Sequence, residues 1–227
     1  MTRKSSLSLR TIHKFNAVIL ILFGLFHMGN HMFLIAGPDT YNTVQDDLNT
    51  VYRFVLIEPI LIASMITQAA IGLVLLIRSF RQVPKRKFSS RDFWEKAQLL
   101  SGIMIVIFIS QHLFALGMLR WTSGLESNFY WPASVMNGAP FIYYFAPYYF
   151  LGVLALFTHV GVGLRYWAMD SGKPTLGNKI AVSAMGLGLL CATTIVLSLA
   201  GVFYEITLPA EWHVYLSKLY PNYAPPQ

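Results

Sequence analysis

The chain has 227 residues, of which 55% are hydrophobic and 12% are charged, and it carries a formal net charge of +7. Because a soluble domain has roughly 25% charged residues, this composition excludes an ordinary water-soluble globule and indicates a membrane protein. The single cysteine, Cys191, excludes a disulfide framework, and the lack of a C-x-x-C-H motif excludes covalent c-type haem attachment.

Five apolar segments are long enough to cross a bilayer as helices, which takes about 20 residues at a rise of 1.5 Å each. The first has no small-residue cleavage site after it, so we expect it to remain as a spanning helix. Breaks between segments coincide with Gly37-Pro38-Asp39, Pro84 and Lys173-Pro174. The sequence therefore predicts a single all-α domain over residues 1–227, an integral membrane bundle of five transmembrane helices near residues 15–36, 54–77, 98–119, 146–168 and 180–203.

The distribution of Lys and Arg predicts the orientation of this bundle. Fourteen of the 17 basic residues fall before the first helix, between the second and third, and between the fourth and fifth. By the positive-inside rule these segments are cytoplasmic, so the N-terminus lies inside and the C-terminus outside a multi-pass protein of the cell inner (cytoplasmic) membrane. Binding to nucleic acid does not explain the charge, because a nucleic-acid patch would not be confined to alternate loops. The fourteen are Arg3, Lys4, Arg10, Lys14, Arg78, Arg81, Lys85, Arg86, Lys87, Arg91, Lys96, Arg165, Lys173 and Lys179.

Histidines are the main ionisable side chains in the middle turns of the predicted helices. His27 and His31 lie on the first helix, His112 on the third and His159 on the fourth. Ionisable groups within spanning segments are costly, so they usually face the bundle interior and mark function. Neutral imidazole needs no counter-ion and is a common axial ligand of haem iron. The pattern indicates a haem-binding membrane protein.

Depth along the helices separates these histidines into two levels. Counted from the inner helix ends at 1.5 Å per residue, His31 lies at about 24 Å, His27 at about 18 Å and His112 at about 21 Å. His159 lies at about 13 Å, at the level of Gln68 on the second helix. A haem with two histidine ligands therefore fits between the first and third helices, in the outer half of the membrane.

Other interpretations of these residues remain open from the sequence alone. A buried histidine is often an interhelical hydrogen-bond partner, which applies to His112 and His159. The His27/His31 pair could bind zinc, although a third protein ligand is not apparent nearby. Small residues flank the polar positions at helical spacing, which suits a porphyrin or ordinary helix packing. These stripes are Gly24, His27 and His31; Ser64, Gln68 and Gly72; and Gly152, Ala155, His159 and Gly163.

The order and depth of the histidines resemble a known family. NHMFLIAG holds His31, SQHLF holds His112 and FTHVGVGLR holds His159, and from about Thr11 to Phe203 the chain resembles the five-helix, di-haem cytochrome b subunit of succinate dehydrogenase and fumarate reductase. The resemblance implies that the first four helices each supply one haem ligand. It further implies that helices 1 and 3 hold the haem farther from the catalytic subunits, and helices 2 and 4 the nearer one.

The chain departs from this family at Gln68, which stands where the family's second helix has its histidine. The resemblance therefore implies an outer haem b between His31 (or His27) and His112, and it leaves the inner haem open. His159 would bind a five-coordinate haem, hydrogen-bond Gln68, or do neither. We expect about one haem per chain.

The resemblance implies a membrane anchor that is itself non-catalytic and passes electrons between a quinone and flavoprotein and iron–sulfur subunits on the cytoplasmic side. The family's quinone site near the outer haem would use Glu58 as proton acceptor, with Arg53 close by in sequence. Glu58 and Arg53 forming an interfacial ion pair is the alternative. Arg120 would bind haem propionates or anchor the helix at the membrane boundary.

Two further functions remain open. One is a stand-alone cytochrome b that keeps one haem without soluble partners. The other is a haem-free structural or transport protein, for which the sequence offers little, because it has no visible inverted repeat or discontinuous polar helix.

The orientation can be tested with reporter fusions. Fusions after Gln82 and Gly172 should read cytoplasmic, and fusions after Asp46 and at Gln227 should read external, because of the asymmetry of the basic residues. An external signal at Gln82 would contradict the five-helix frame.

Overall fold

The computed structural model describes residues 8–82 and 91–224, and every regular element in these ranges is a helix. Five helices are long and apolar enough to cross a membrane, which confirms the predicted all-α class and the five spans. Their bounds are α1 Leu9–Met32, α3 Ile57–Gln82, α4 Phe93–Met118, α6 Ile142–Asp170 and α7 Pro174–Leu199. Three shorter helices were not predicted: α2 Pro38–Tyr52, α5 Tyr130–Met136 and α8 Ala210–Leu219.

Several helices begin earlier than the hydropathy pattern indicated, because local caps define their ends. The Ser8 hydroxyl accepts a hydrogen bond from the Thr11 amide at 3.1 Å, and α1 begins at Leu9 instead of residue 15. The Asp92 carboxylate accepts one from the Glu95 amide at 2.8 Å, and α4 begins at Phe93 instead of residue 98. Hydropathy identifies only the apolar part of a helix. The capped helices begin several residues earlier, in polar sequence.

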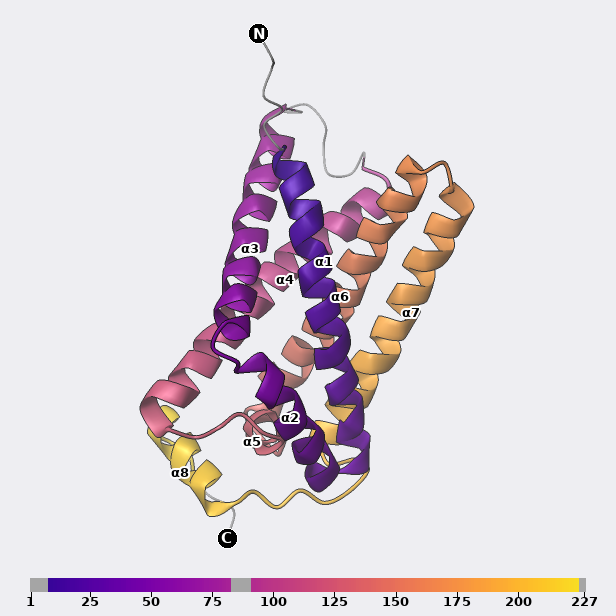
Figure 1. The fold of residues 1–227 in the computed structure, drawn as a ribbon. Helices are drawn as coiled ribbons and strands as arrows, with labels where there is room; N and C mark the ends of the chain where they lie inside the picture. Colours follow the sequence, from indigo (N-terminus) through magenta and orange to yellow (C-terminus); the bar gives the residue numbers. More distant parts are fainter. Residues whose placement is uncertain (1–7, 83–90, 225–227) are drawn as a thin grey trace.

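The start of α1 and the end of α8 lie at opposite ends of the bundle (Figure 1). The start of α1 and the turn between α6 and α7 lie at one end, and α2, α5 and α8 lie at the other (Figure 1). We call the end that holds the start of α1 and the α6–α7 turn the inner end. The described basic residues from Arg10 to Lys179 lie at or beside helix ends there, except for Arg53 and Arg120. Outside the described residues lie Arg3, Lys4, Pro84, Lys85, Arg86 and Lys87.

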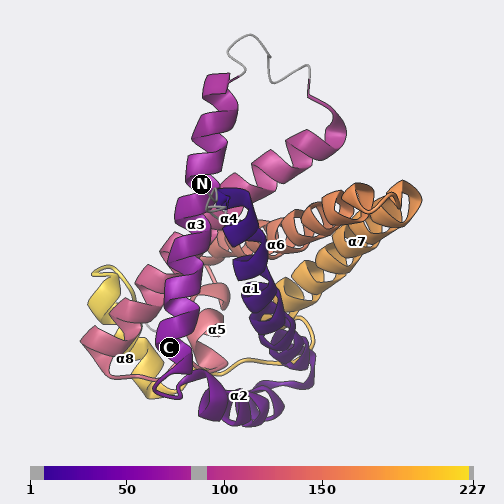
Figure 2. The ribbon, with the colours of Figure 1, turned by 45° about the horizontal axis from the view of Figure 1, so that its top comes forward.

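The long helices pack in two groups. The backbones of α6 and α7 are in the most extensive contact, α4 packs on α6, and α1 packs on α3. In both ribbon views α6 and α7 run side by side, while α4 crosses behind α1 and α3 at a steep angle (Figures 1 and 2). Among the described residues, the pair α1–α3 makes few backbone contacts with α4 and α6. We call the interface between α1–α3 and α4–α6 the seam.

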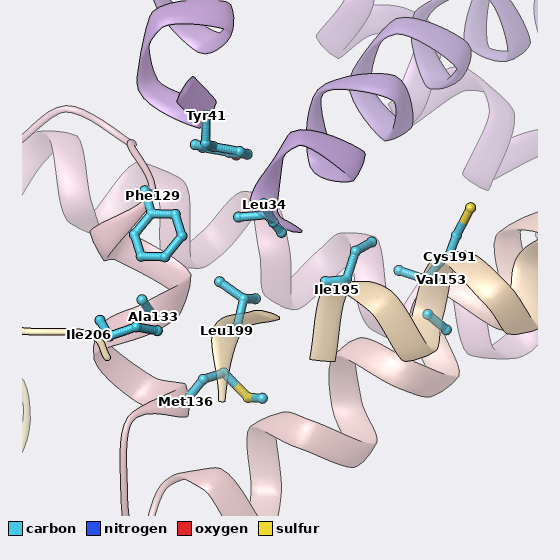
Figure 3. Packing of buried hydrophobic residues seen from close by; sticks show 11 residues of the cluster. Leu34, Tyr41, Phe129, Ala133, Met136, Val153, Cys191, Ile195, Leu199 and Ile206 are labelled. Atoms are coloured by element: carbon cyan, nitrogen blue, oxygen red, sulfur yellow. The ribbon is translucent and has the colours of Figure 1, made fainter. Parts of the chain in front are cut away.

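The outer end is closed by the short helices, which we call the cap (α2, α5 and α8). Buried side chains from the cap meet the ends of α1 and α7 in one apolar cluster that includes Leu34, Tyr41, Phe129 and Leu199 (Figure 3). The Tyr204 hydroxyl donates a hydrogen bond to the Leu34 carbonyl, which ties the segment after α7 to the end of α1. Each fully buried Leu or Phe side chain stabilises the fold by roughly 1.5–3 kcal/mol, so this cluster helps to hold the cap on the bundle.

The α6–α7 pairing depends on glycine, and this dependence is testable. A Cβ on Gly188 would lie 2.5 Å from Cβ of Phe157, whereas a Cβ on Gly186 of the same helix would have nothing within 4 Å. Gly188→Ala should therefore destabilise the protein by about 1–3 kcal/mol through overpacking. Thermal unfolding in detergent, followed by circular dichroism, measures the change.

Gly186→Ala is the matched control. It should be neutral, or more stable by roughly 0.5–1 kcal/mol, because alanine has the higher helix propensity. Equal effects of the two substitutions would contradict the described packing of α7 on α6.

Candidate functional site

Three histidines from two helices converge in the seam, and we call them the outer histidine cluster: His27 and His31 of α1 and His112 of α4. The ring centres of His27 and His31 are 4.6 Å apart, and those of His27 and His112 are 6.3 Å apart. His27 and His31 are four residues apart and share a helix face, and α4 brings His112 to the same level. The convergence of the first and third spanning helices on one level agrees with the depth expected from the sequence.

Aromatic side chains surround this cluster. Phe23 stacks on His27 with ring centres 5.2 Å apart, and Phe108 stacks on His112 at 5.8 Å. Trp131 of α5 lies 5.5 Å from His112. The cap therefore contributes directly to the surroundings of the cluster. The sequence analysis, which predicted only the five spanning helices, did not anticipate this contribution.

Tyr41 of α2 fixes the orientation of His31. Its ring is nearly parallel to the imidazole, at an interplanar angle of 3°, and its hydroxyl lies 3.2 Å from Nδ1 of His31. Burial raises the pKa of Tyr41 above its usual range, so the phenol stays protonated. With Nδ1 engaged by Tyr41, the other ring nitrogen of His31, Nε2, is left for a different partner.

The spanning histidines keep part of their surface accessible although they lie deep in the bundle. His27, His31, His112 and His159 are all only half-buried. Gly24, on the same face of α1 as His27 and His31, would have nothing within 4 Å of an added Cβ. Sparse backbone contact across the seam explains both observations. The seam thus presents imidazoles that neighbouring side chains do not fully cover.

A second group of polar side chains lies nearer the inner end. His159 of α6 has its ring nitrogens within 3.3 Å of the Gln98 amide nitrogen and, through Nδ1, within 3.3 Å of the Ser101 hydroxyl. Both partners lie on α4. Gln98, Ser101 and Gly102 share a helix face, a spacing that could have been recognised in the sequence.

Gln68 bonds to α1 and does not share the partners of His159. Its Oε1 accepts a hydrogen bond from Asn16 at 2.9 Å, and its Nε2 lies 3.5 Å from Nδ1 of His13. His13 is half-buried there. Because α1 begins at Leu9, His13 lies within the helix and packs against α3, where its Nε2 would be 3.6 Å from a Cβ on Gly72.

We call these residues the inner polar cluster. His13 lies on the α1–α3 side of the seam and His159 on the α4–α6 side. At the inner rim, Lys14 of α1 forms a 3.2 Å ion pair with Asp170 at the end of α6, which holds the two sides of the seam together. The members of the cluster are His13, Asn16, Gln68, Gln98, Ser101 and His159.

The small-residue stripes have mixed roles. Gly152 is buried, and the Phe108 ring occupies the space where its Cβ would be, so Gly152 serves helix packing. Gly163 would have nothing within 4 Å of an added Cβ. Gly72 lies against His13. The stripe on α6 is therefore not a uniform cofactor face, because its outer part packs on α4.

The two arginines at the outer rim pair with acidic residues in a crossed arrangement. Arg120 bonds to Glu58, and Arg53 bonds to Glu126 at 2.7 Å. The alternative of an ion pair between Arg53 and Glu58 is therefore wrong. Partly exposed pairs of this kind each contribute about 0–1 kcal/mol, so they position side chains more than they stabilise the fold.

A half-open cavity of about 250 Å³ lies at this rim, lined by Arg53, Arg120, Gly124, Leu125 and Glu126. The Nε of Arg53 is buried there without a hydrogen-bond partner. The cavity thus presents two guanidinium groups at the outer boundary, one of which holds Glu58.

The imidazoles of the outer histidine cluster are groups that could hold haem iron. In the described part of the chain, no three His, Cys, Asp or Glu side chains come close enough to hold a metal ion together. Haem needs only axial ligands, because the porphyrin supplies the other four. An imidazole nitrogen binds a first-row metal at about 2 Å, so ring centres on opposite faces of one iron lie roughly 6 Å apart. The ring centres of His27 and His112, 6.3 Å apart, are at about this separation.

Comparisons with known proteins add no assignment: no family model, no curated protein and no solved structure matches this chain.

Proposed function

We propose that the chain is a haem b-binding membrane anchor that passes electrons between a quinone and a succinate dehydrogenase- or fumarate reductase-like partner. The observation that carries the proposal is the convergence of His31 and His27 with His112 inside an apolar five-helix bundle. Haem bound there supplies one-electron redox chemistry, and its potential is set by its axial ligands and burial. In this function the chain is a non-catalytic subunit of an oxidoreductase.

His112 and His31 are the proposed axial ligands. His112 is the histidine that α4 contributes at this level. Metal-binding histidines usually engage their second ring nitrogen with a partner that fixes the ring, and Tyr41 lies in that position beside His31. The His27 ring lies 4.6 Å from that of His31 and 6.3 Å from that of His112, and it stacks on Phe23. The aromatic side chains and the cap cover part of the imidazole surface.

The outer rim is the proposed quinone site. Glu58 lies in the first turn of α3 and is held by Arg120, which lines the rim cavity together with Arg53. A carboxylate at the membrane boundary accepts the protons that quinol oxidation releases. Arg120 could also bind a haem propionate, because guanidinium groups pair well with carboxylates.

The proposed partners dock at the inner end. Under the positive-inside rule this end is cytoplasmic and the protein spans the cell inner membrane, so soluble flavoprotein and iron–sulfur subunits would meet the basic end of the bundle. A stand-alone cytochrome b with one haem is the second candidate. It is favoured by the amide at Gln68, which bonds to Asn16 and offers no iron ligand where the family's inner haem has one.

Haem content and the axial ligands can be tested together. The purified protein should contain b-type haem at about one per chain in a pyridine haemochrome assay. His112→Ala and His31→Ala should each abolish the low-spin spectrum, because each removes a proposed ligand, and His27→Ala should have a smaller effect. No haem in protein made with ample haem supply would refute the proposal.

His159→Ala is the control substitution. Because His159 lies nearer the inner end than His112, its loss should leave the spectrum of the outer haem intact. Loss of the haem in His159→Ala but not in His112→Ala would move the iron to the inner half. Co-purification of flavoprotein separates the anchor from the stand-alone cytochrome.

Tyr41→Phe tests the hydrogen bond to His31. The ring stack is kept and only the hydroxyl is lost, so the protein should fold and bind haem. Loss of such an outer partner typically weakens metal binding 10- to 100-fold, so the variant should release haem faster and shift its midpoint potential. Phe23→Leu, which alters the packing on His27, should leave the potential closer to that of the parent.

A further inference from the structure

Two consecutive residues between α2 and α3 carry hydrogen-bond donors that lack an acceptor. The hydroxyl of Tyr52, the last residue of α2, and the Nε of Arg53 are both buried, and neither has a hydrogen-bond partner among the described residues. Burial raises the pKa of Tyr52, so the phenol keeps its proton and can donate it. A buried donor without an acceptor is costly, so two of them in consecutive residues indicate an acceptor that binds beside them.

The packing of α1 on α3 sets the depth of this part of the chain. The two helices run in opposite directions (Figure 1), and the Asn16 amide donates a hydrogen bond to the Ser64 carbonyl at 2.8 Å. Towards the outer end, Phe23 lies seven residues beyond Asn16, which is about 10 Å of helix. In the same direction Glu58 lies six residues beyond Ser64, which is about 9 Å. The start of α3 is therefore level with Phe23, one helical turn from His27.

Ring contacts confirm this level and connect Tyr52 to the outer histidine cluster. The ring of Tyr52 meets Phe23 edge-on with ring centres 5.1 Å apart, and Phe23 stacks on His27 at 5.2 Å. These three rings form a row from the end of α2 to the cluster. The next residue, Arg53, lines the rim cavity together with Arg120. The two donors therefore lie beside the cluster, where the chain passes from α2 to α3.

The chemistry of the donors favours a carboxylate as the acceptor. Arg53 already bonds to Glu126 through Nη1, so its Nε–H is the part of the guanidinium that is left over. Guanidinium groups pair well with carboxylates, and a hydrogen bond to a charged oxygen is stronger than one to a neutral oxygen. Haem carries two carboxylates, its propionates, on one edge of the porphyrin. A suitable acceptor would therefore arrive with the ligand that the neighbouring histidines are proposed to bind.

We propose that Tyr52 and Arg53 bind a propionate of the haem in the outer histidine cluster. The Tyr52 hydroxyl and the Arg53 Nε–H donate hydrogen bonds to its carboxylate oxygens, so the propionate edge of the porphyrin faces the α2–α3 connection. The inference rests on the proposed function, because it takes haem as the ligand of the cluster. Hydrogen bonds to a propionate offset its negative charge, which otherwise stabilises ferric iron, so these donors raise the midpoint potential of the haem.

The test is redox-induced infrared difference spectroscopy of the intact, haem-loaded protein, with haem isotopically labelled at its propionate carboxyl carbons. Tyr52→Phe keeps the ring contact with Phe23 and removes only the hydroxyl, so the variant should fold and bind haem. The carboxylate bands that respond to the label should shift in this variant. Its haem should also dissociate about tenfold faster, because losing a hydrogen bond to a charged group changes affinity by that order. Arg53→Lys, which keeps the charge but removes the Nε–H donor, should shift the same bands.

Tyr41→Phe is the matched control, because it removes a hydroxyl that contacts His31. It should change the midpoint potential through the axial ligand and leave the label-sensitive propionate bands in place. A haem-loaded parent protein whose propionate bands are unchanged in both Tyr52→Phe and Arg53→Lys would overturn this inference alone, even if those variants weakened quinone binding at the rim. A parent protein that binds no haem would refute the proposed function and this inference together.

Discussion

The seam is the feature on which the other parts of the structure depend. In a bilayer core, polar side chains that find no partner are costly, so they gather where helices face one another instead of lipid. Here α6 and α7 pack closely on each other and α4 packs on α6, while α1 and α3 form a second pair that makes few backbone contacts with α4 and α6. The sparsely packed interface between these groups holds the histidines and amides. It concentrates the groups able to bind a cofactor within an otherwise apolar protein.

The cap gives the seam different properties at its two ends. At the outer end, Tyr41 and Trp131 pack beside His31 and His112, so aromatic surface covers part of these histidines. At the inner end, amides and hydroxyls contact His13 and His159. Imidazoles in apolar, aromatic surroundings suit axial ligation of haem, and imidazoles among amides suit hydrogen bonding. The same residue type therefore lies in two different environments at two depths.

Small residues in the bundle have two roles that their sequence pattern does not distinguish. Gly152 and Gly188 allow close packing against Phe108 and Phe157, whereas Gly24 and Gly163 lie next to open space. All four are glycines in spanning helices. Only the position of the neighbouring helix determines whether such a glycine serves packing or leaves room beside a polar side chain.

The sequence alone determined the helical class, the five spans and the shared level of His27, His31 and His112, because hydropathy and helical rise are local properties that each helix carries by itself. The tertiary structure decided which side chains meet. Gln68 and His159 are at matching depths in sequence, yet Gln68 bonds to Asn16 and His159 contacts Gln98, because α3 packs on α1 and α6 packs on α4. His13 and Tyr41 entered the site for the same reason: α1 begins earlier than its apolar segment, and α2 folds back over the outer end. The depth of a side chain along its helix limits its possible contacts to residues at the same level. The packing of the helices then determines which of those residues it contacts.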